Sequence, residues 1–222
     1  MLNYSENKPS KEYIKHIEYY KKMHREGYSL INGKFRKSEN AYDGKSTIAF
    51  AHTINKIIIK NSILSILDYG CGKAFYYNNG FTIDNKKINS LRDHWNADIN
   101  LYDPCFEKYS KFPNKRVDLT ICIDVLEHIP EIDIDWILHK IFSITNKFVF
   151  LNIACYNAIA LLPNGQNAHT NIKEPKWWFK KLVSFKKEFP SLKIICLCAV
   201  INEKGQKDYF PINIDDKITN YA

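Results

Sequence analysis

Short apolar runs separated by polar segments dominate the chain from residue 63 onward. Runs of this length are typical of strands that are buried on both faces. Six runs are predicted strands, and they cover residues 63–69, 99–103, 117–124, 147–155, 192–201 and 208–214. The last two flank the turn-like segment NEKGQK and are predicted to form an antiparallel hairpin.

Apolar residues at helical spacing occur between these strands. The segment EIDIDWILHKIFSIT places Ile134, Ile137 and Ile141 on one side of a helix. A further helix is predicted over residues 175–189, where a proline occupies the first turn. Helices that alternate with buried strands predict an α/β fold with a mostly parallel sheet.

Two more helical patterns precede the first strand. Residues 10–26 begin with a serine cap, and Gly27 is predicted to end the helix. Its apolar stripe consists of Ile14, Ile17, Tyr20 (or Tyr19) and Met23. With a second helix over 47–60, residues 1–60 are predicted to form an N-terminal helical cap on a core of residues 61–222.

Composition limits the classes of function. With 45% hydrophobic and 14% aromatic residues, the chain is predicted to be globular. Its polar beginning predicts no secretory leader, and its longest apolar run, 148–162, is too short and too polar to span a membrane. A cytoplasmic location is therefore expected. The net charge of +8 comes from dispersed lysines and predicts only a weak general attraction to anionic partners. No RNA-binding module is visible, so a nucleic-acid partner is not expected, and nothing in the sequence indicates an oligomeric state.

The six cysteines show no spacing that indicates a metal or disulfide framework. None of them forms a CxxC pair, and Cys196 and Cys198 alternate within a predicted strand. Because free cysteine is usually a small buried residue, we predict core positions for the cysteines and no metal site.

The first predicted strand ends in LDYGCGKAF, where Gly70 and Gly72 are separated by one residue. Such glycines can form a tight turn and nothing more. They also allow a ligand to lie against the backbone at the carboxyl end of a parallel strand, where α/β proteins bind ligands. The dinucleotide fingerprint GxGxxG would require glycine in place of Phe75, which argues against a nicotinamide-dependent oxidoreductase.

Acidic residues mark the ends of three predicted strands. Asp68 lies in the first, Asp103 ends INLYD, and Asp124 ends VDLTICID. A carboxylate at such a position can accept hydrogen bonds from both hydroxyls of a ribose. The pattern predicts a pocket for a nucleoside that carries a positive charge.

Three segments in this order, ILDYGCGK, LYDP and VDLTICIDVLEHIP, resemble the motifs of class I S-adenosylmethionine-dependent methyltransferases. The resemblance covers about residues 60–155 and implies a Rossmann-like methyltransferase fold that binds S-adenosylmethionine. The cofactor-binding residues that it implies are Asp68 for the ammonium group, Gly70, Cys71 and Gly72 for the methionine part, Asp103 and Pro104 for the ribose, and Asp124 and Val125 for the sulfonium side.

Two features depart from that resemblance. Ala74 occupies a position where the family often has a third glycine. Only thirteen residues separate Asp103 from Val117, where many relatives have a helix and a strand that ends in an adenine-binding acid. The adenine contact and one edge of the sheet are therefore not assigned by the sequence.

Two histidines are candidate general bases for an acceptor hydroxyl. His128 follows the strand that ends at Asp124 and is expected to face the pocket, or else to pack against the next helix. His169 lies in the loop LPNGQNAHTNIKEPKWWF, at the same edge of the sheet. This polar loop and the pair Trp177 and Trp178 suit a sugar or nucleotide, the alternative being a plain connector with core tryptophans.

We therefore expect methyl transfer to an oxygen of a small polar or anionic acceptor, without a metal. The pattern LPNGxNAH…PxWW resembles a subgroup associated with bacterial surface-polysaccharide genes, which implies a sugar or a nucleotide-linked precursor as the acceptor. RNA methylation and a non-catalytic, cofactor-binding partner subunit are the alternatives.

Two further segments allow two interpretations each. The segment AYDGKS (41–46) either folds over the cofactor or is a plain loop. The lysines of 175–189 form either a solvated face or a phosphate-binding patch.

Overall fold

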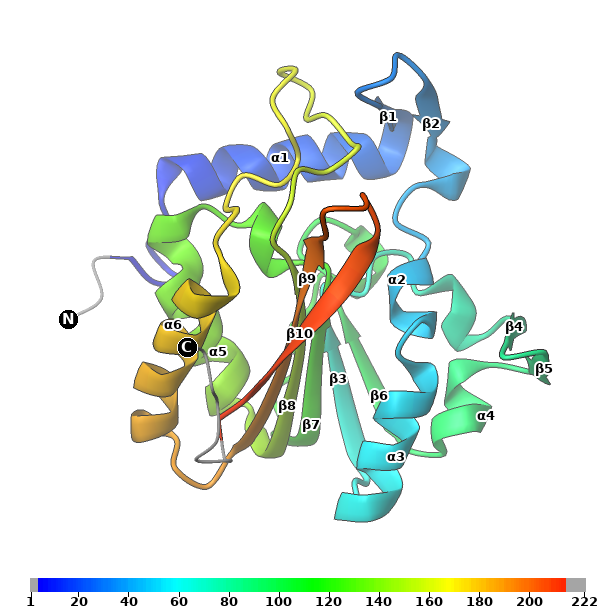
Figure 1. Cartoon of the computed structure of the whole chain (residues 1–222), viewed down its shortest axis with the longest axis vertical. Helices are drawn as coiled ribbons and strands as arrows, with labels where there is room; N and C mark the ends of the chain where they lie inside the picture. Colours follow the sequence, from blue (N-terminus) through cyan, green and yellow to red (C-terminus); the bar gives the residue numbers. More distant parts are fainter. Residues whose placement is uncertain (1–3, 215–222) are drawn as a thin grey trace.

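The structure, a computed structural model, describes residues 4–214 and is built around a six-stranded sheet (Figure 1). The strand order is β10-β9-β8-β7-β3-β6, in which β10 is antiparallel to β9 and the other neighbours are parallel. The strands are β3 (Ser65–Tyr69), β6 (Asp98–Tyr102), β7 (Val117–Ile123), β8 (Thr145–Ala154), β9 (Lys193–Ile201) and β10 (Lys207–Asn213). The predicted α/β class is confirmed, with its mostly parallel sheet and C-terminal antiparallel hairpin. Residues 215–222 of the predicted core lie outside the described residues.

Helices cover both faces of the sheet, as its apolar strands require. They are α1 (Lys11–Glu26), α2 (Lys45–Ile48), α3 (Ala51–Asn61), α4 (Leu91–Trp95), α5 (Ile134–Ser143) and α6 (Pro175–Glu188), with 3-10 turns at Ser38–Asn40, Phe75–Tyr77, Glu107–Tyr109, Leu126–His128 and Glu131–Asp133. Along β7, Leu119 and Ile121 pack toward α3, whereas Cys122 packs toward α5. Figure 1 shows α3 and α4 on one side of the sheet and α5 and α6 on the other.

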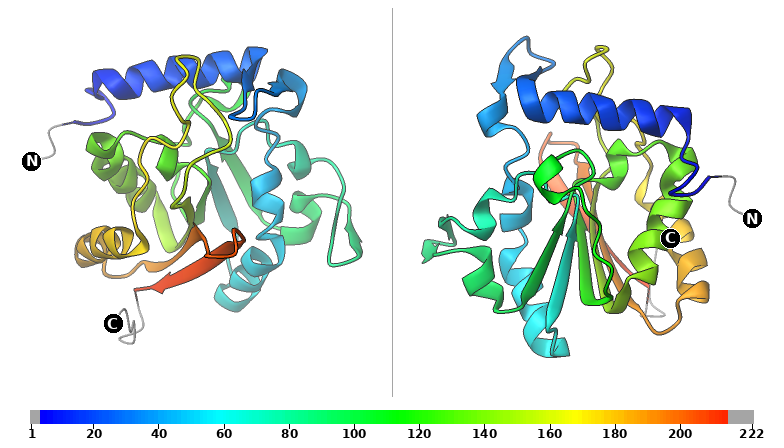
Figure 2. Two further views of the ribbon diagram at one scale, coloured as in Figure 1. Left: turned by 45° about the horizontal axis from the view of Figure 1, so that its top comes forward. Right: turned by 180° about the vertical axis from the view of Figure 1, so that it is seen from behind.

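Helix α1 lies across the carboxyl ends of the strands, which Figures 1 and 2 both show. Ser10 caps it by accepting a hydrogen bond from the Tyr13 amide, and its own amide donates to Asp133 Oδ1 at 3.0 Å. The helix ends at Gly27, as predicted. Met23 of the predicted apolar stripe is buried, but Ile14 is 51% exposed, so the face that contacts the sheet is rotated from the expected one.

The structure differs from the prediction in several respects, most of them in the N-terminal region. The predicted helix over 47–60 is divided into α2 and α3. Helix α3 belongs to the core that covers the sheet, so the segment that caps the strand ends is α1 with the chain up to α2. A hairpin of β1 (Gly27–Ser29) and β2 (Phe35–Lys37), and a second of β4 (Phe81–Ile83) and β5 (Lys86–Ile88), were not predicted, because three-residue strands are too short to show a period.

Strand β6 is one of the two edge strands of the sheet, and only a 3-10 turn connects the Asp103 loop to β7. The short connection seen in the sequence thus contains no additional strand. Among residues 4–214, no helix combines the length and the apolar character needed to cross a bilayer.

Candidate functional site

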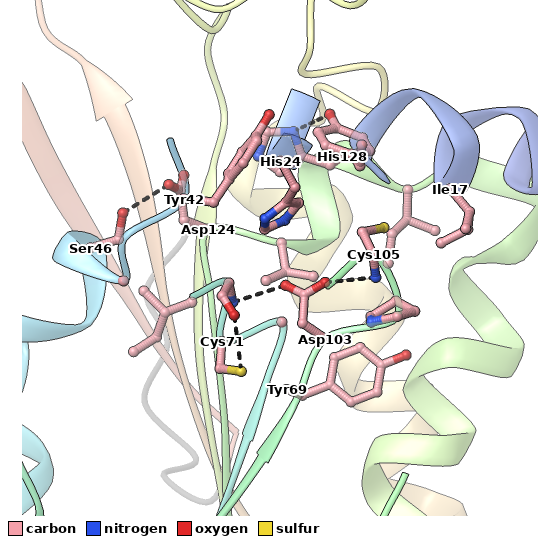
Figure 3. A pocket seen from close by; sticks show the side chains of 18 of the residues that line it. Ile17, His24, Tyr42, Ser46, Tyr69, Cys71, Asp103, Cys105, Asp124 and His128 are labelled. Carbon is pink, nitrogen blue, oxygen red and sulfur yellow. Dashed lines mark hydrogen bonds between the residues drawn. The ribbon is translucent and has the colours of Figure 1, made fainter. Parts of the chain in front are cut away.

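A cavity lies between α1 and the carboxyl ends of β3, β6 and β7 (Figure 3). It encloses about 910 Å³, a volume that includes the part open to solvent. Its lining includes these predicted site residues: Gly70, Cys71, Gly72, Asp103, Pro104, Asp124, Val125 and His128. Asp68 and His169 are not part of that lining.

The glycine turn packs tightly against other parts of the protein. Gly70 has φ +84°, and a Cβ built on it would lie 2.3 Å from Val125 Cγ2. Gly72 has φ +57°, and its Cβ would lie 2.4 Å from the carbonyl oxygen of Tyr42. Any side chain at either position would collide with these neighbours or strain the backbone. The turn therefore requires glycine for protein packing, and it also presents its backbone to the cavity.

Asp103 fixes this turn from the neighbouring strand. Its Oδ2 accepts a hydrogen bond from the Gly72 amide at 2.8 Å, and its Oδ1 accepts one from the Cys105 amide at 2.8 Å (Figure 3). Burial raises the pKa of Asp103, although these backbone hydrogen bonds oppose the increase. A carboxylate has about four acceptor positions. The pKa of Asp103 is also lowered by a backbone hydrogen bond from Phe106, so the carboxylate can hold the loop and still accept a hydroxyl group of a ligand.

Asp124 ends β7 with φ +61°, a conformation that is uncommon outside glycine. Its side chain is open to solvent through the cavity, and Oδ2 accepts a hydrogen bond from Ser46 Oγ at 2.9 Å (Figure 3). Burial by the surrounding chain raises the pKa of Asp124, but His128, Ser46, His169 and Lys207 outweigh it and lower the pKa below its usual value. Asp124 thus presents a negative charge to the cavity.

Two imidazole rings lie beside Asp124, with centroids 4.8 Å apart. Nδ1 of His128 is 3.0 Å from the carbonyl oxygen of Ala168, and Nδ1 of His169 contacts that of Tyr156. Because a carbonyl only accepts, each Nδ1 is a donor, which leaves each Nε2 with a free lone pair. His128 lines the cavity as predicted, whereas His169 is not among the lining residues and is only 8% exposed.

Both imidazoles are held in the neutral form. Burial lowers the pKa of His128 to about 4, the charge of His169 lowers it further, and Asp124 opposes the decrease. Burial also lowers the pKa of His169, against the opposing effects of the Tyr156 hydrogen bond and Asp124. At neutral pH each Nε2 is therefore available as a base or a ligand atom.

Glu127 joins the polar loop to the strand ends. Its Oε1 accepts a hydrogen bond from the Ala154 amide at 2.6 Å, and its backbone carbonyl accepts from the amides of Thr170 and Asn171, each at 3.0 Å. Burial, followed by the charge of Asp124, raises the pKa of Glu127 well above its usual value. The loop that carries His169 is thereby held over β7 and β8.

The predicted contact between Asp68 and a cofactor ammonium group is not supported by the geometry. Asp68 is 2% exposed and its Oδ2 accepts a hydrogen bond from Tyr77 Oη at 2.7 Å. Side chains alternate between the faces of a strand, and Asp68 points toward the α4 side of β3, away from the cavity.

Asp68→Asn is expected to increase the free energy of unfolding at pH 8 by on the order of 1–4 kcal/mol. Burial raises the folded-state pKa of Asp68 to about 7, against an ordinary value of 3.8. Between about pH 3.8 and pH 7, Asp68 is ionised in the unfolded chain but still protonated in the folded one. The free energy of unfolding therefore falls as the pH rises through this interval, and the whole loss is present above about pH 7. Asparagine does not ionise and still accepts from Tyr77.

Urea denaturation of both proteins at about pH 4 and about pH 8 measures this effect. The advantage of the asparagine variant should be small at the lower pH and large at the higher one. An equal difference at both values would contradict an ionisable, destabilising Asp68.

Helix α1 supplies one wall of the cavity, which sequence reasoning did not identify. Its lining residues are Tyr13, His16, Ile17, Tyr20 and His24. They recur at intervals of three and four, so the pattern was visible, but it was interpreted as packing alone. Tyr13 and Ile17 give this wall an apolar part, and Figure 3 shows Ile17 on the same side of the cavity as Cys105 of the Asp103 loop.

The segment 41–46, which was expected to fold over the cofactor or to be a plain loop, lies against the glycine turn. The carbonyl oxygens of Tyr42 and Asp43 accept hydrogen bonds from the amides of Lys73 and Phe75, at 2.7 and 3.0 Å. Gly44 and Ser46 line the cavity, whereas Lys45 does not.

The tryptophan pair is not part of the cavity. Trp178 is completely buried in the core beneath α6, as the alternative interpretation held. Trp177 is half-buried between the amino groups of Lys173 and Lys181, which lie 5.4 and 5.2 Å from its ring. Lys181 also pairs with Asp135 at 2.5 Å, which favours a solvated face over a phosphate-binding patch.

The chain matches no protein-family profile, no curated protein and no solved structure. The interpretation of the cavity therefore depends on its own residues.

Proposed function

We propose that this protein transfers a methyl group from S-adenosylmethionine to an oxygen of a small polar acceptor in the cytoplasm. One observation supports this most strongly: the glycine turn, Asp103 and Asp124 come from the ends of three adjacent strands and line a single cavity. This combination suits a ligand that joins a ribose to a positively charged group.

The residues present fit such a cofactor. Asp103 retains acceptor capacity for a ribose hydroxyl, and Gly70 and Gly72 have no side chain that would block the methionine part. The negative charge of Asp124 suits the cationic part of the ligand. The apolar surface of Tyr13 and Ile17 offers a place for the adenine, which the sequence did not provide.

When bound, S-adenosylmethionine would supply a methyl group activated by its sulfonium sulfur. Such a transfer is an in-line displacement, so the main task of the protein is to align donor and acceptor. His128 lines the cavity and its Nδ1 is engaged by Ala168, so its Nε2 would accept the proton of an acceptor hydroxyl. A sugar or a nucleotide-linked precursor of a surface polysaccharide is the acceptor that we propose, and the polar loop 163–174 lies beside this wall.

Isothermal titration calorimetry with S-adenosylmethionine tests this proposal directly. One molecule is expected to bind per chain with a dissociation constant in the micromolar range, and S-adenosylhomocysteine should compete for the same site. NAD is the matched control, because it shares the adenosine but adds a pyrophosphate for which the turn lacks the third glycine. Binding of NAD without binding of S-adenosylmethionine, or no heat with either, would refute the proposal.

A further inference from the structure

We propose that Asp124, His128 and His169 form a binding site for a divalent first-row transition-metal ion such as Zn²⁺. One potential ligand atom from each residue lies within 4.8 Å of the other two. Ligand atoms on one zinc ion are separated by about 3–4 Å, because each lies about 2 Å from the metal. Small side-chain rotations would therefore bring the three groups onto a single ion.

The orientation of the two imidazoles is a separate indication of a metal site. Histidines that bind a metal usually donate their other ring N–H to a carbonyl or carboxylate, which fixes the tautomer and aims the free nitrogen. His128 and His169 both meet this condition, through the carbonyl oxygens of Ala168 and Tyr156. Tyr20 reinforces the first of these contacts, since its hydroxyl lies 2.8 Å from His128 Nδ1 and donates to the same carbonyl at 2.9 Å.

Glu127 adds a second observation that favours a cation. Its side chain is 0% exposed, and Oε2 has no hydrogen-bond partner among the described residues. A buried oxygen of this kind without a hydrogen-bond partner is unfavourable, and a cation bound close to it would offset that cost.

The ligand set indicates the class of metal. Imidazole nitrogen suits Zn²⁺ and its transition-metal neighbours, whereas Mg²⁺ and Ca²⁺ prefer oxygen ligands alone. Two imidazoles with one carboxylate leave at least one coordination position open, as in catalytic zinc sites. Asp124 and His128 both line the cavity, so that open position would face it.

No metal was expected from the sequence, because His169 is forty-one residues from His128 and no spacing rule connects them. Metal binding does not depend on the proposed methyl transfer, because it can be measured without S-adenosylmethionine. If both hold, neither imidazole is the general base in the metal-loaded protein, and the charge of Asp124 is neutralised by the metal instead of attracting the cationic part of the cofactor.

Isothermal titration of chelator-treated protein with ZnCl₂ tests the site. The wild-type chain is expected to bind one Zn²⁺, whereas MgCl₂ should give no comparable binding. His169→Ala and Asp124→Asn should each weaken Zn²⁺ binding by at least about 10- to 100-fold. Asparagine tolerates the positive φ of Asp124, so the second variant removes the charge while keeping the backbone conformation.

Two control variants address binding elsewhere on the surface. His52 and His94 lie together, with Nδ1 and Nε2 3.2 Å apart, and His139 pairs with Glu188 on an exposed helix face. His52→Ala/His94→Ala and His139→Ala should retain the high-affinity Zn²⁺ site. Absorption of the Co²⁺-substituted protein reports the ligands, since thiolate ligation adds an intense near-ultraviolet band that an Asp-His-His site lacks.

The proposal is overturned if wild-type protein binds no Zn²⁺ or binds Mg²⁺ as tightly. It is also overturned if binding persists in His169→Ala, disappears in His52→Ala/His94→Ala, or shows the thiolate band. Circular dichroism of each variant establishes that it is folded, and Asp124→Asn provides the test if His169→Ala is not.

Discussion

Replacing Asp103 with alanine is expected to weaken binding of S-adenosylmethionine by at least about 100-fold, equivalent to about 2.7 kcal/mol. Asp103 has two tasks that the substitution removes together. It accepts hydrogen bonds from the Gly72 and Cys105 amides, and each amide left buried without a partner costs about 1–3 kcal/mol. Its remaining acceptor positions are those that we assign to the ribose hydroxyls.

Asp118→Ala is the matched control. Asp118 also accepts a hydrogen bond from a backbone amide, that of Leu64 at 2.9 Å. It lies near the amino end of β7, however, far along the strand from the carboxyl ends that line the cavity. Its removal should lower stability and leave cofactor affinity unchanged. Calorimetric titration of both variants, with urea denaturation in parallel, separates the two effects.

The variant Asp103→Asn separates the contribution of the backbone hydrogen bonds from that of ribose binding. Asparagine keeps one carbonyl oxygen for a backbone amide, but its amino group cannot accept a ribose hydroxyl. We expect an affinity between those of the wild-type and alanine proteins. Equal affinities for the wild-type and Asp103→Ala proteins would place the nucleoside elsewhere.

Most strands could be predicted from the sequence because they are largely apolar runs of strand length that are bounded by turn residues. Strand β10 could be predicted in this way too, although its residues 207–211 are exposed. The ends of β3, β6 and β7 could be predicted for the same reason, since Gly70, Asp103 and Asp124 follow directly after those runs. Parallel strands bring their carboxyl ends to one edge of the sheet. The sequence was therefore sufficient to predict that the residues at these three strand ends lie together.

The upper part of the site could not be predicted, because it is made by contacts between distant segments. Tyr20 and Ala168 are 148 positions apart and yet fix the same imidazole. Asp68 was assigned to the cofactor from its position in the motif, but side-chain alternation along β3 directs it to Tyr77. Local patterns reveal strand ends, whereas the direction of a side chain depends on register and on long-range packing.

Gly70→Ala is expected to lower the free energy of unfolding by about 2–5 kcal/mol, because two unfavourable effects add. A methyl group at this position would lie 2.3 Å from Val125 Cγ2, and overpacking of this kind costs about 1–3 kcal/mol. The positive φ of +84° adds about 1–2 kcal/mol for any residue with a Cβ. Urea denaturation measures the sum.

Two further variants separate the collision from the backbone strain. Gly205 has φ +73° with no atom within 4 Å of a built Cβ, so Gly205→Ala should show the strain alone, about 1–2 kcal/mol. Val125→Ala removes the two methyl groups that a residue-70 side chain would meet, and the double variant Gly70→Ala/Val125→Ala should therefore be more stable than additivity predicts, by about 1–3 kcal/mol. Strict additivity would mean that the turn shifts to avoid Val125, and the glycine would then be required by φ alone. Val125 also lines the cavity, so the double variant can regain stability without regaining affinity for S-adenosylmethionine. Calorimetric titration of the double variant measures whether cofactor binding depends on the Val125 side chain.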